Sequence, residues 1–219
     1  MALRSSGRTP SRRLVLGAGA LTALVATGIG VAASLGVTST TLTTYVAASS
    51  VPGCTSPGTQ TASANADSWV DQGSSSSNFG TDAILKVRSQ SGGNYRALVR
   101  FSLPGQPSGC TVTLATLRLY AAASTTGRTL QALRLASSWT ESGVTWSNQP
   151  ATTGTAATAA SGLGWREWTV TSQVQAMYSS ANDGFLVRDQ AEDGGGAEQS
   201  LHSREKAPDN PPELVITFG

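Results

Sequence analysis

The sequence is poor in the side chains on which most enzymes and metal sites depend. It has one histidine, His202, and two cysteines, and only 13% of its residues are charged. These residues do not supply the four Cys or His ligands of a structural zinc site. The sequence has no Gly-x-Ser-x-Gly elbow beside which the histidine could serve in a Ser-His-Asp triad. We therefore expect a satisfied surface histidine and no catalytic residues.

Negative charge is missing from the first part of the chain, where no acidic residue precedes Asp67. Arginines at positions 4, 8, 12 and 13 stand before an uncharged run from Leu14 to Val37. A basic start followed by an apolar stretch is typical of an export signal, and Arg12-Arg13 indicates the twin-arginine type. We expect residues 1–48 to be removed. The run is also long enough to cross a bilayer, so an uncleaved membrane anchor is the alternative. We expect no other contact with a membrane.

The charge of the remaining chain does not favour nucleic acid as a partner. Without the four N-terminal arginines, eleven basic and thirteen acidic residues are left, a net charge of 11 − 13 = −2. The isoelectric point of 8.7 therefore belongs mostly to the signal, and it is no evidence for nucleic-acid binding. Residues 49–63 are rich in Ser, Thr, Pro and Gly, which predicts a linker. Residues 64–219 then form one extracellular or cell-surface domain.

The two cysteines, Cys54 and Cys110, form an even count in a chain that we expect to be exported, which favours a disulfide. The bond would tie the linker to the domain and stabilise it by about 4 kcal/mol in the chain-entropy model. Two free thiols or a metal pair are the alternatives.

Apolar and polar residues alternate through most of residues 64–219, as they do in half-buried antiparallel strands. The alternating runs are 84–89, 96–101, 115–120, 132–135, 184–189, 199–203 and 213–218. Residues 171–178 have helical spacing instead, with Thr171 or Ser172 as the cap. Residues 152–160 are rich in Thr, Ala and Gly and predict a flexible loop. The sequence thus predicts an all-β, jelly-roll-like antiparallel β-sandwich of eight or nine strands with one short helix.

Basic residues fall on the strand faces opposite the apolar ones. They are Lys86, Arg88, Arg96, Arg100, Arg118 and Arg134. If these strands pair side by side, the six residues build a basic surface for an anionic polysaccharide, since guanidinium groups match carboxylates and phosphates. Cross-strand pairing with Asp and Glu is the alternative. Aromatic residues could stack on sugar rings, but an aromatic ring is more often core. We therefore expect at most two exposed rings among Trp69, Tyr95, Tyr120, Trp165 and Trp168.

An acidic, glycine-flanked loop is a candidate calcium site, because calcium takes several oxygen ligands from flexible backbone. Its carboxylates are Asp189, Glu192 and Asp193. A solvated turn is the alternative, and no other cofactor is expected. Glu141 and Glu167 could form a glycosidase pair, but nothing in the sequence brings them together.

The most distinctive stretch runs from Trp139 to Pro150 and reads WTESGVTWSNQP. It resembles the Trp-x-Glu-x-x-Val-Thr-Trp-x-x-x-Pro signature of the DNRLRE domains, also classed as carbohydrate-binding module family 96. The likeness extends over residues 64–218 and includes 95–101, 115–120 and 184–189. We expect Trp139 and Trp146 to be buried anchors, Pro150 to close the segment, and Glu141 to accept hydrogen bonds from nearby backbone N–H groups.

The resemblance implies an exported, non-catalytic β-sandwich that binds a cell-wall or extracellular polysaccharide. A structural or adhesive surface protein that binds another protein is the alternative. A polysaccharide hydrolase is a third hypothesis.

Overall fold

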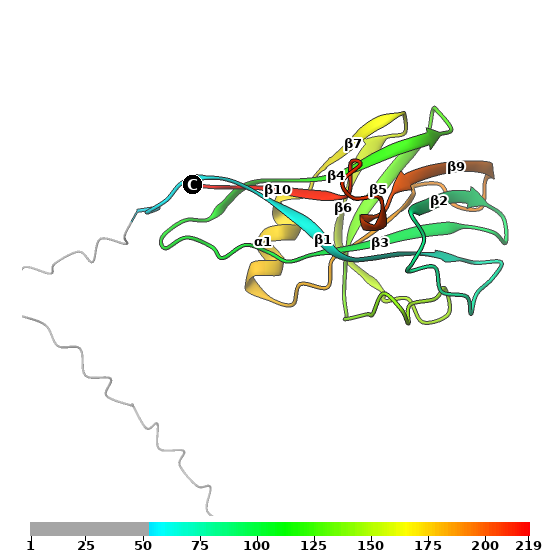
Figure 1. Ribbon diagram of the computed structural model, residues 1–219, viewed down its shortest axis with the longest axis horizontal. Helices are drawn as coiled ribbons and strands as arrows, with labels where there is room; N and C mark the ends of the chain where they lie inside the picture. The colour runs from blue at the N-terminus through cyan, green and yellow to red at the C-terminus, as the bar shows by residue number, and fades with distance from the viewer. Residues whose placement is uncertain (1–52) are drawn as a thin grey trace, which may run out of the picture. The chain divides into compact units, whose positions relative to one another are not determined.

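The computed structural model describes residues 53–219 (Figure 1). The expected export signal or anchor, residues 1–48, and its cleavage site lie outside these residues. The described chain forms ten strands, one α-helix and one 3-10 helix. They are β1 (Gly58–Asp71), β2 (Ile84–Gln90), β3 (Tyr95–Phe101), β4 (Val112–Ser124), β5 (Thr129–Leu135), β6 (Thr152–Ala160), β7 (Gly164–Thr169), α1 (Thr171–Ser179), β8 (Phe185–Asp189), β9 (Gly195–His202), η1 (Arg204–Lys206) and β10 (Glu213–Phe218).

Strand β1 joins the two halves of the sheet. Its residues 58–63 pair with β10 and its residues 64–71 pair with β3. The strand order is β1-β10-β4-β9-β2-β3-β8-β5-β6, and β7 also pairs with β4. Because β1 bonds to two strands that are distant in that order, the sheet folds back on itself. The all-β antiparallel class is confirmed, and the jelly-roll-like sandwich stays a prediction.

The main core lies between the two halves of the sheet. Leu117 of β4 and Ile216 of β10 belong to the same hydrophobic cluster as Val99 of β3 and Val187 of β8. All four are fully buried, as the alternation in these strands predicts. We call the side of a strand that faces this cluster its inner side and the opposite side its outer side.

A second hydrophobic cluster covers the outer side of β1, β3 and β8. Its members are Ala66, Val70, Leu98, Leu135, Trp139, Val144 and Leu186. Leu98 alternates with the core residue Val99, so it points away from the main core. The Trp139–Pro150 segment between β5 and β6 therefore lies on the outside of the sheet and supplies the apolar cover that this side needs.

The structure differs from the sequence-based expectation in three elements. Residues 152–160, expected as a flexible loop, form β6 and pair with β5 at one end of the strand order. Strand β1 begins at Gly58, inside the expected linker, because its first residues bond to β10. Helix α1 is confirmed, but the residue at its N-cap is Val170, with no side-chain cap bond. The Thr171 hydroxyl instead accepts a hydrogen bond from the N–H of Ala115 at 3.0 Å.

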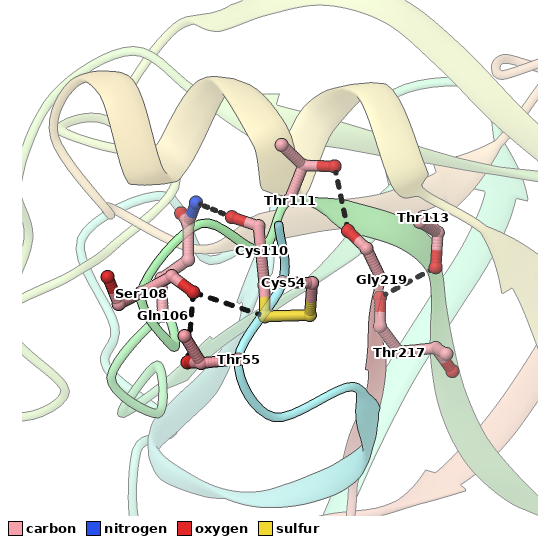
Figure 2. Close-up of a disulfide and its surroundings, with 9 residues drawn as sticks. All are labelled: Cys54, Thr55, Gln106, Ser108, Cys110, Thr111, Thr113, Thr217 and Gly219. Carbon is pink, nitrogen blue, oxygen red and sulfur yellow. Dashed lines mark hydrogen bonds between the residues drawn. A yellow bond between two sulfur atoms is a disulfide. The ribbon is translucent and has the colours of Figure 1, made fainter. Parts of the chain in front are cut away.

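The expected disulfide between Cys54 and Cys110 is confirmed (Figure 2). On one side of it the N–H of Thr55 donates to the carbonyl of Ser108 at 3.0 Å. On the other side, Thr111 and Gly219 exchange two backbone hydrogen bonds of 2.9 and 3.1 Å. The start and the end of the domain are thus held together at one end. Within residues 53–219, no helix is long and apolar enough to cross a membrane.

Candidate functional site

The six basic residues do not share one face. Arg88 lies opposite Tyr95 across β2 and β3, so it points to the same side as Tyr95 and to the other side from Arg96. Arg134 lies opposite Phe185, which lies opposite Val99, so it points away from the side of Arg96 and Arg100. The strand pairing therefore corrects the prediction of a single basic surface, because neighbouring strands present their basic residues to different sides.

Four of the six basic side chains lie beside carboxylates. Lys86 and Arg88 approach Glu198 at 4.0 and 3.9 Å. Arg96 forms a bidentate pair with Glu192, with bonds of 2.7 and 2.8 Å. Arg118 contacts Glu167 at 2.8 Å and Glu213 at 2.5 Å. For Lys86, Arg88 and Arg118 this is the cross-strand pairing that the sequence left open as the alternative, whereas the partner of Arg96 lies in the loop between β8 and β9.

Arg100 and Arg134 make their hydrogen bonds to neutral oxygens. Arg100 donates to the carbonyl of Trp139 at 3.2 Å. Arg134 donates to the hydroxyl of Ser180 at 3.0 Å. Among residues 53–219, no carboxylate forms an ion pair with either of these two guanidinium groups.

The candidate calcium ligands are each engaged by a different partner. Asp189 accepts two hydrogen bonds of 2.8 Å from Arg128, and Glu192 accepts those of Arg96. Asp193 accepts the side-chain amide of Asn94 at 2.7 Å. Three separate partners hold these three carboxylates, and two of the partners already supply positive charge.

Another acidic cluster lies where the Trp139–Pro150 segment meets β1 and η1. Oxygens of Asp67, Glu141 and Glu205 lie within 4.8 Å of one another. Arg204 already supplies a cation there, since it bonds to both Glu141 oxygens at 2.7 Å and approaches Glu205 at 3.1 Å. Glu141 also accepts the N–H of Asp67 at 2.9 Å, so it ties the segment to β1.

Burial dominates the electrostatics of Asp67, which is 1% exposed. Desolvation raises the pKa of its carboxyl group to about 7, and the hydrogen bond from the N–H of Arg204 works against that increase. The carboxylates of Glu205 and Glu141 add to the increase. The cluster thus holds a buried acid that changes charge near neutral pH.

The five tryptophans fall into two groups. Trp69, Trp139 and Trp168 are buried, and their indole N–H groups donate to Asp82, to the Asp183 carbonyl and to the Leu130 carbonyl. Trp146 and Trp165 are half-buried, and among residues 53–219 their indole N–H groups have no hydrogen-bond partner. The expectation that Trp146 is buried like Trp139 is therefore wrong, because it lies at the rim of the second cluster.

Trp165 stands on the outer side of β7, within a regular antiparallel ladder. It lies opposite Tyr120, and Glu167 lies opposite Arg118. The rings of Tyr120 and Trp165 meet edge to face at 5.6 Å. The Arg118 guanidinium lies 4.4 Å from the centre of the Trp165 ring. An indole whose N–H is unpaired within the described part of the chain is thus held beside a phenol, a guanidinium and a carboxylate.

Trp146 is surrounded in a similar way on the opposite half of the sheet. The Arg96 guanidinium lies 4.4 Å from its ring centre. Arg96 also donates to the side-chain oxygen of Gln149 at 3.2 Å, and the Gln149 amide donates to the Trp146 carbonyl at 3.0 Å. Arg96 and Gln149 therefore hold both the ring and the backbone carbonyl of Trp146.

His202 is buried, 5% exposed, and not the surface residue expected from the sequence. Its ring nitrogen Nδ1 lies 2.7 Å from the carbonyl of Asp209, and its ring lies 4.9 Å from that of Tyr120. Glu141 and Glu167, considered above as a glycosidase pair, do not contact each other. Glu141 binds Arg204, and Glu167 binds Arg118.

Residues 58–218 match the model of carbohydrate-binding module family 96. The chain belongs to this family. No curated protein matches the chain. The match begins at Gly58, where β1 begins, and so covers the whole ladder that carries Trp165. The resemblance read from the Trp139–Pro150 signature is thereby confirmed.

Proposed function

We propose that the chain is an exported, non-catalytic module that binds a cell-wall or extracellular polysaccharide through the surface around Trp165. The observation that carries this proposal is the half-buried indole on a regular strand, whose N–H has no partner among residues 53–219. Aromatic rings present a flat apolar body with a polar edge, which suits the apolar face and the hydroxyl rim of a sugar ring. The ladder fixes the ring before a ligand arrives, which lowers the entropy lost on binding.

The polar groups around Trp165 are suited to sugar hydroxyls. Arg118 supplies N–H donors in a rigid fork, and Glu167 supplies carboxylate acceptors. Arg118 faces two carboxylates, Glu167 and Glu213, so this surface carries one net negative charge. That balance favours a neutral polysaccharide here. An anionic chain would have to use other parts of the domain, such as Arg100.

Export is supported by two features of different kinds. The disulfide between Cys54 and Cys110 suits an oxidising compartment outside the cytoplasm. The basic and apolar N-terminal sequence is typical of an export signal. A secreted module without catalytic chemistry would hold its bearer at a polysaccharide surface.

Trp165→Ala tests the function and its site. Soluble hexasaccharides, with cellohexaose and laminarihexaose as neutral members and oligogalacturonate as an acidic one, would be titrated into the purified protein by calorimetry. We expect Trp165→Ala to weaken binding of the preferred sugar by at least tenfold and to leave the thermal midpoint within a few degrees, since the ring is half-buried.

Leu114→Ala is the matched control. Leu114 is 47% exposed, lies on β4 like Tyr120, and is separated from it by about 20 Å of strand. The Leu114→Ala variant removes apolar surface from the same side of the sheet as Trp165→Ala, and we expect this variant to bind the sugar as the parent does. Equal binding by Trp165→Ala and the parent would refute the site, and no binding of any saccharide on a broad glycan array would refute the function.

A further inference from the structure

We infer that Trp146 forms a second saccharide-binding site, directed away from the Trp165 site, so that one module can hold two polysaccharide chains. The chemical class of the ligand rests on the proposed function. The second site rests on the structure around Trp146 and does not use any residue of the Trp165 surface.

The two tryptophans lie on outer sides of different halves of the folded sheet. Trp165 and Arg118 point away from the core residue Leu117, which alternates with Arg118 on β4. Trp146 packs on the second hydrophobic cluster, which covers the outer side of β1, β3 and β8. The main core lies between these two sides. Figure 1 shows β7 at the top of the domain and the segment between β5 and β6 at the bottom.

The Trp146 ring shares the three features on which the Trp165 proposal depends. It is half-buried, its indole N–H is unpaired among the described residues, and a guanidinium lies 4.4 Å from its centre. The buried tryptophans lack the first two. Arg96 is itself held by both oxygens of Glu192, so the cation stays beside the ring rather than in solvent.

The segment that carries Trp146 is braced by its own polar side chains. Asn148 accepts the N–H of Thr145 at 2.7 Å and donates to the carbonyl of Gly143 at 2.9 Å. The N–H of Ser147 donates to the carbonyl of Ser75 at 3.0 Å. A loop fixed in this way keeps its aromatic ring in place without a ligand, so little ordering entropy opposes binding.

Two sites on opposite sides have a consequence that one site does not have. A single module could bridge two polysaccharide chains, and many modules could cross-link a soluble polymer. On a single long chain the two sites could not both engage unless that chain wrapped around the domain. Cross-linking therefore reveals a second site in a way that the affinity of a single site does not.

The test uses the five indole N–H signals in an amide-type NMR spectrum of the unaltered protein, assigned by single Trp→Phe variants. The probe is the hexasaccharide that binds best in calorimetry. We expect the signals of Trp146 and Trp165 to shift in a titration with two equivalents bound, while those of Trp69, Trp139 and Trp168 stay fixed. The three buried indoles are internal controls.

Each other outcome has a distinct meaning. A shift of Trp165 alone, with one equivalent bound, would overturn the second site and leave the proposed function standing. A shift of Trp146 alone would overturn both the bivalency and the Trp165 site. If neither signal shifts although the sugar binds, both tryptophan sites are refuted while carbohydrate binding stands.

Cross-linking provides the second measurement. The parent would be mixed with the matching soluble polysaccharide, and light scattering should rise with protein concentration as modules bridge two chains. At excess protein it should fall again, because each binding position on the polysaccharide is then occupied by a separate module. Trp146→Leu keeps an apolar side chain on the second cluster but removes the aromatic face. We expect it to bind one equivalent of hexasaccharide and to lose the scattering rise. Unchanged scattering with a folded Trp146→Leu protein would overturn the inference.

Discussion

Replacing Asp67 with Asn should change how the stability of the domain depends on pH. Burial raises the pKa of Asp67 to about 7, against 3.8 for an ordinary carboxyl group. The folded state therefore binds this proton more tightly than the unfolded state does. Its contribution to the unfolding free energy is fully present below pH 3.8 and is lost as the pH rises through 7. At 1.36 kcal/mol for each pH unit between the two values, the loss is about 4 kcal/mol at most.

Asn is suited to this test because it has no charge at any pH used. It also keeps a side-chain oxygen, which can accept the hydrogen bond that the Arg204 N–H donates to the Asp67 carboxylate at 2.7 Å. Thermal or urea unfolding would be measured at pH 5 and pH 8. We expect Asp67→Asn to be more stable than the parent by about 1.6 kcal/mol at pH 5, which lies 1.2 units above the ordinary pKa of 3.8, and by up to about 4 kcal/mol at pH 8. The parent should lose stability between these two values, and the variant should lose less.

Asp82→Asn is the matched control for this experiment. Asp82 also accepts one N–H group, that of the Trp69 indole at 2.9 Å, but it is half-buried rather than buried. We expect its curve to run parallel to that of the parent. Parallel curves for Asp67→Asn and the parent between pH 5 and pH 8 would refute the reasoning on burial.

Three further outcomes follow from the disulfide, the tryptophans and the N-terminal sequence. Replacing Cys54 and Cys110 together with Ser should lower the unfolding free energy by about 4 kcal/mol, and the native protein should show no thiol to an alkylating reagent before reduction. Trp139→Ala should lower the unfolding free energy by about 3–5 kcal/mol, whereas Trp146→Ala should lower it clearly less, because only the first ring is buried; equal losses in denaturant titrations would contradict this difference. Intact-mass analysis of the exported protein should give a chain that begins near Ser49, and retention of residues 1–48 would support the anchor.

Strands were predictable where one side is buried and the other is not. Strands β2 and β10 alternate cleanly between buried and half-buried positions, and both were found from the sequence. Strand β6 has no buried residue at all. This strand is held by its hydrogen bonds to β5, and a pattern of alternating apolar residues in the sequence cannot predict such bonds. A strand of small residues at the end of the strand order is therefore hidden from a pattern that depends on burial.

The candidate site was less predictable than the fold, because alternation assigns faces within a strand but does not say which strands are neighbours. Arg88 and Arg96 each lie opposite an apolar face, yet the pairing of Arg88 with Tyr95 turns them to different sides. The tryptophans show the same limit. Trp165 and Trp168 are three residues apart on one strand, and only the register with β4 shows that Trp168 faces the core. The unpaired indole N–H has no signal in the sequence.

The disulfide also decides how the domain would carry a mechanical load. Cys54 lies ahead of β1 and is bonded to Cys110, close to the start of β4, a strand that pairs with β10, β9 and β7. A pull on the chain before Cys54 passes through the sulfur atoms into the loop ahead of β4. In the reduced protein the same pull would detach β1 from β10 one pair at a time, beginning at Gly58 and Phe218. The oxidised domain would then stay folded at a tension that unzips the reduced one.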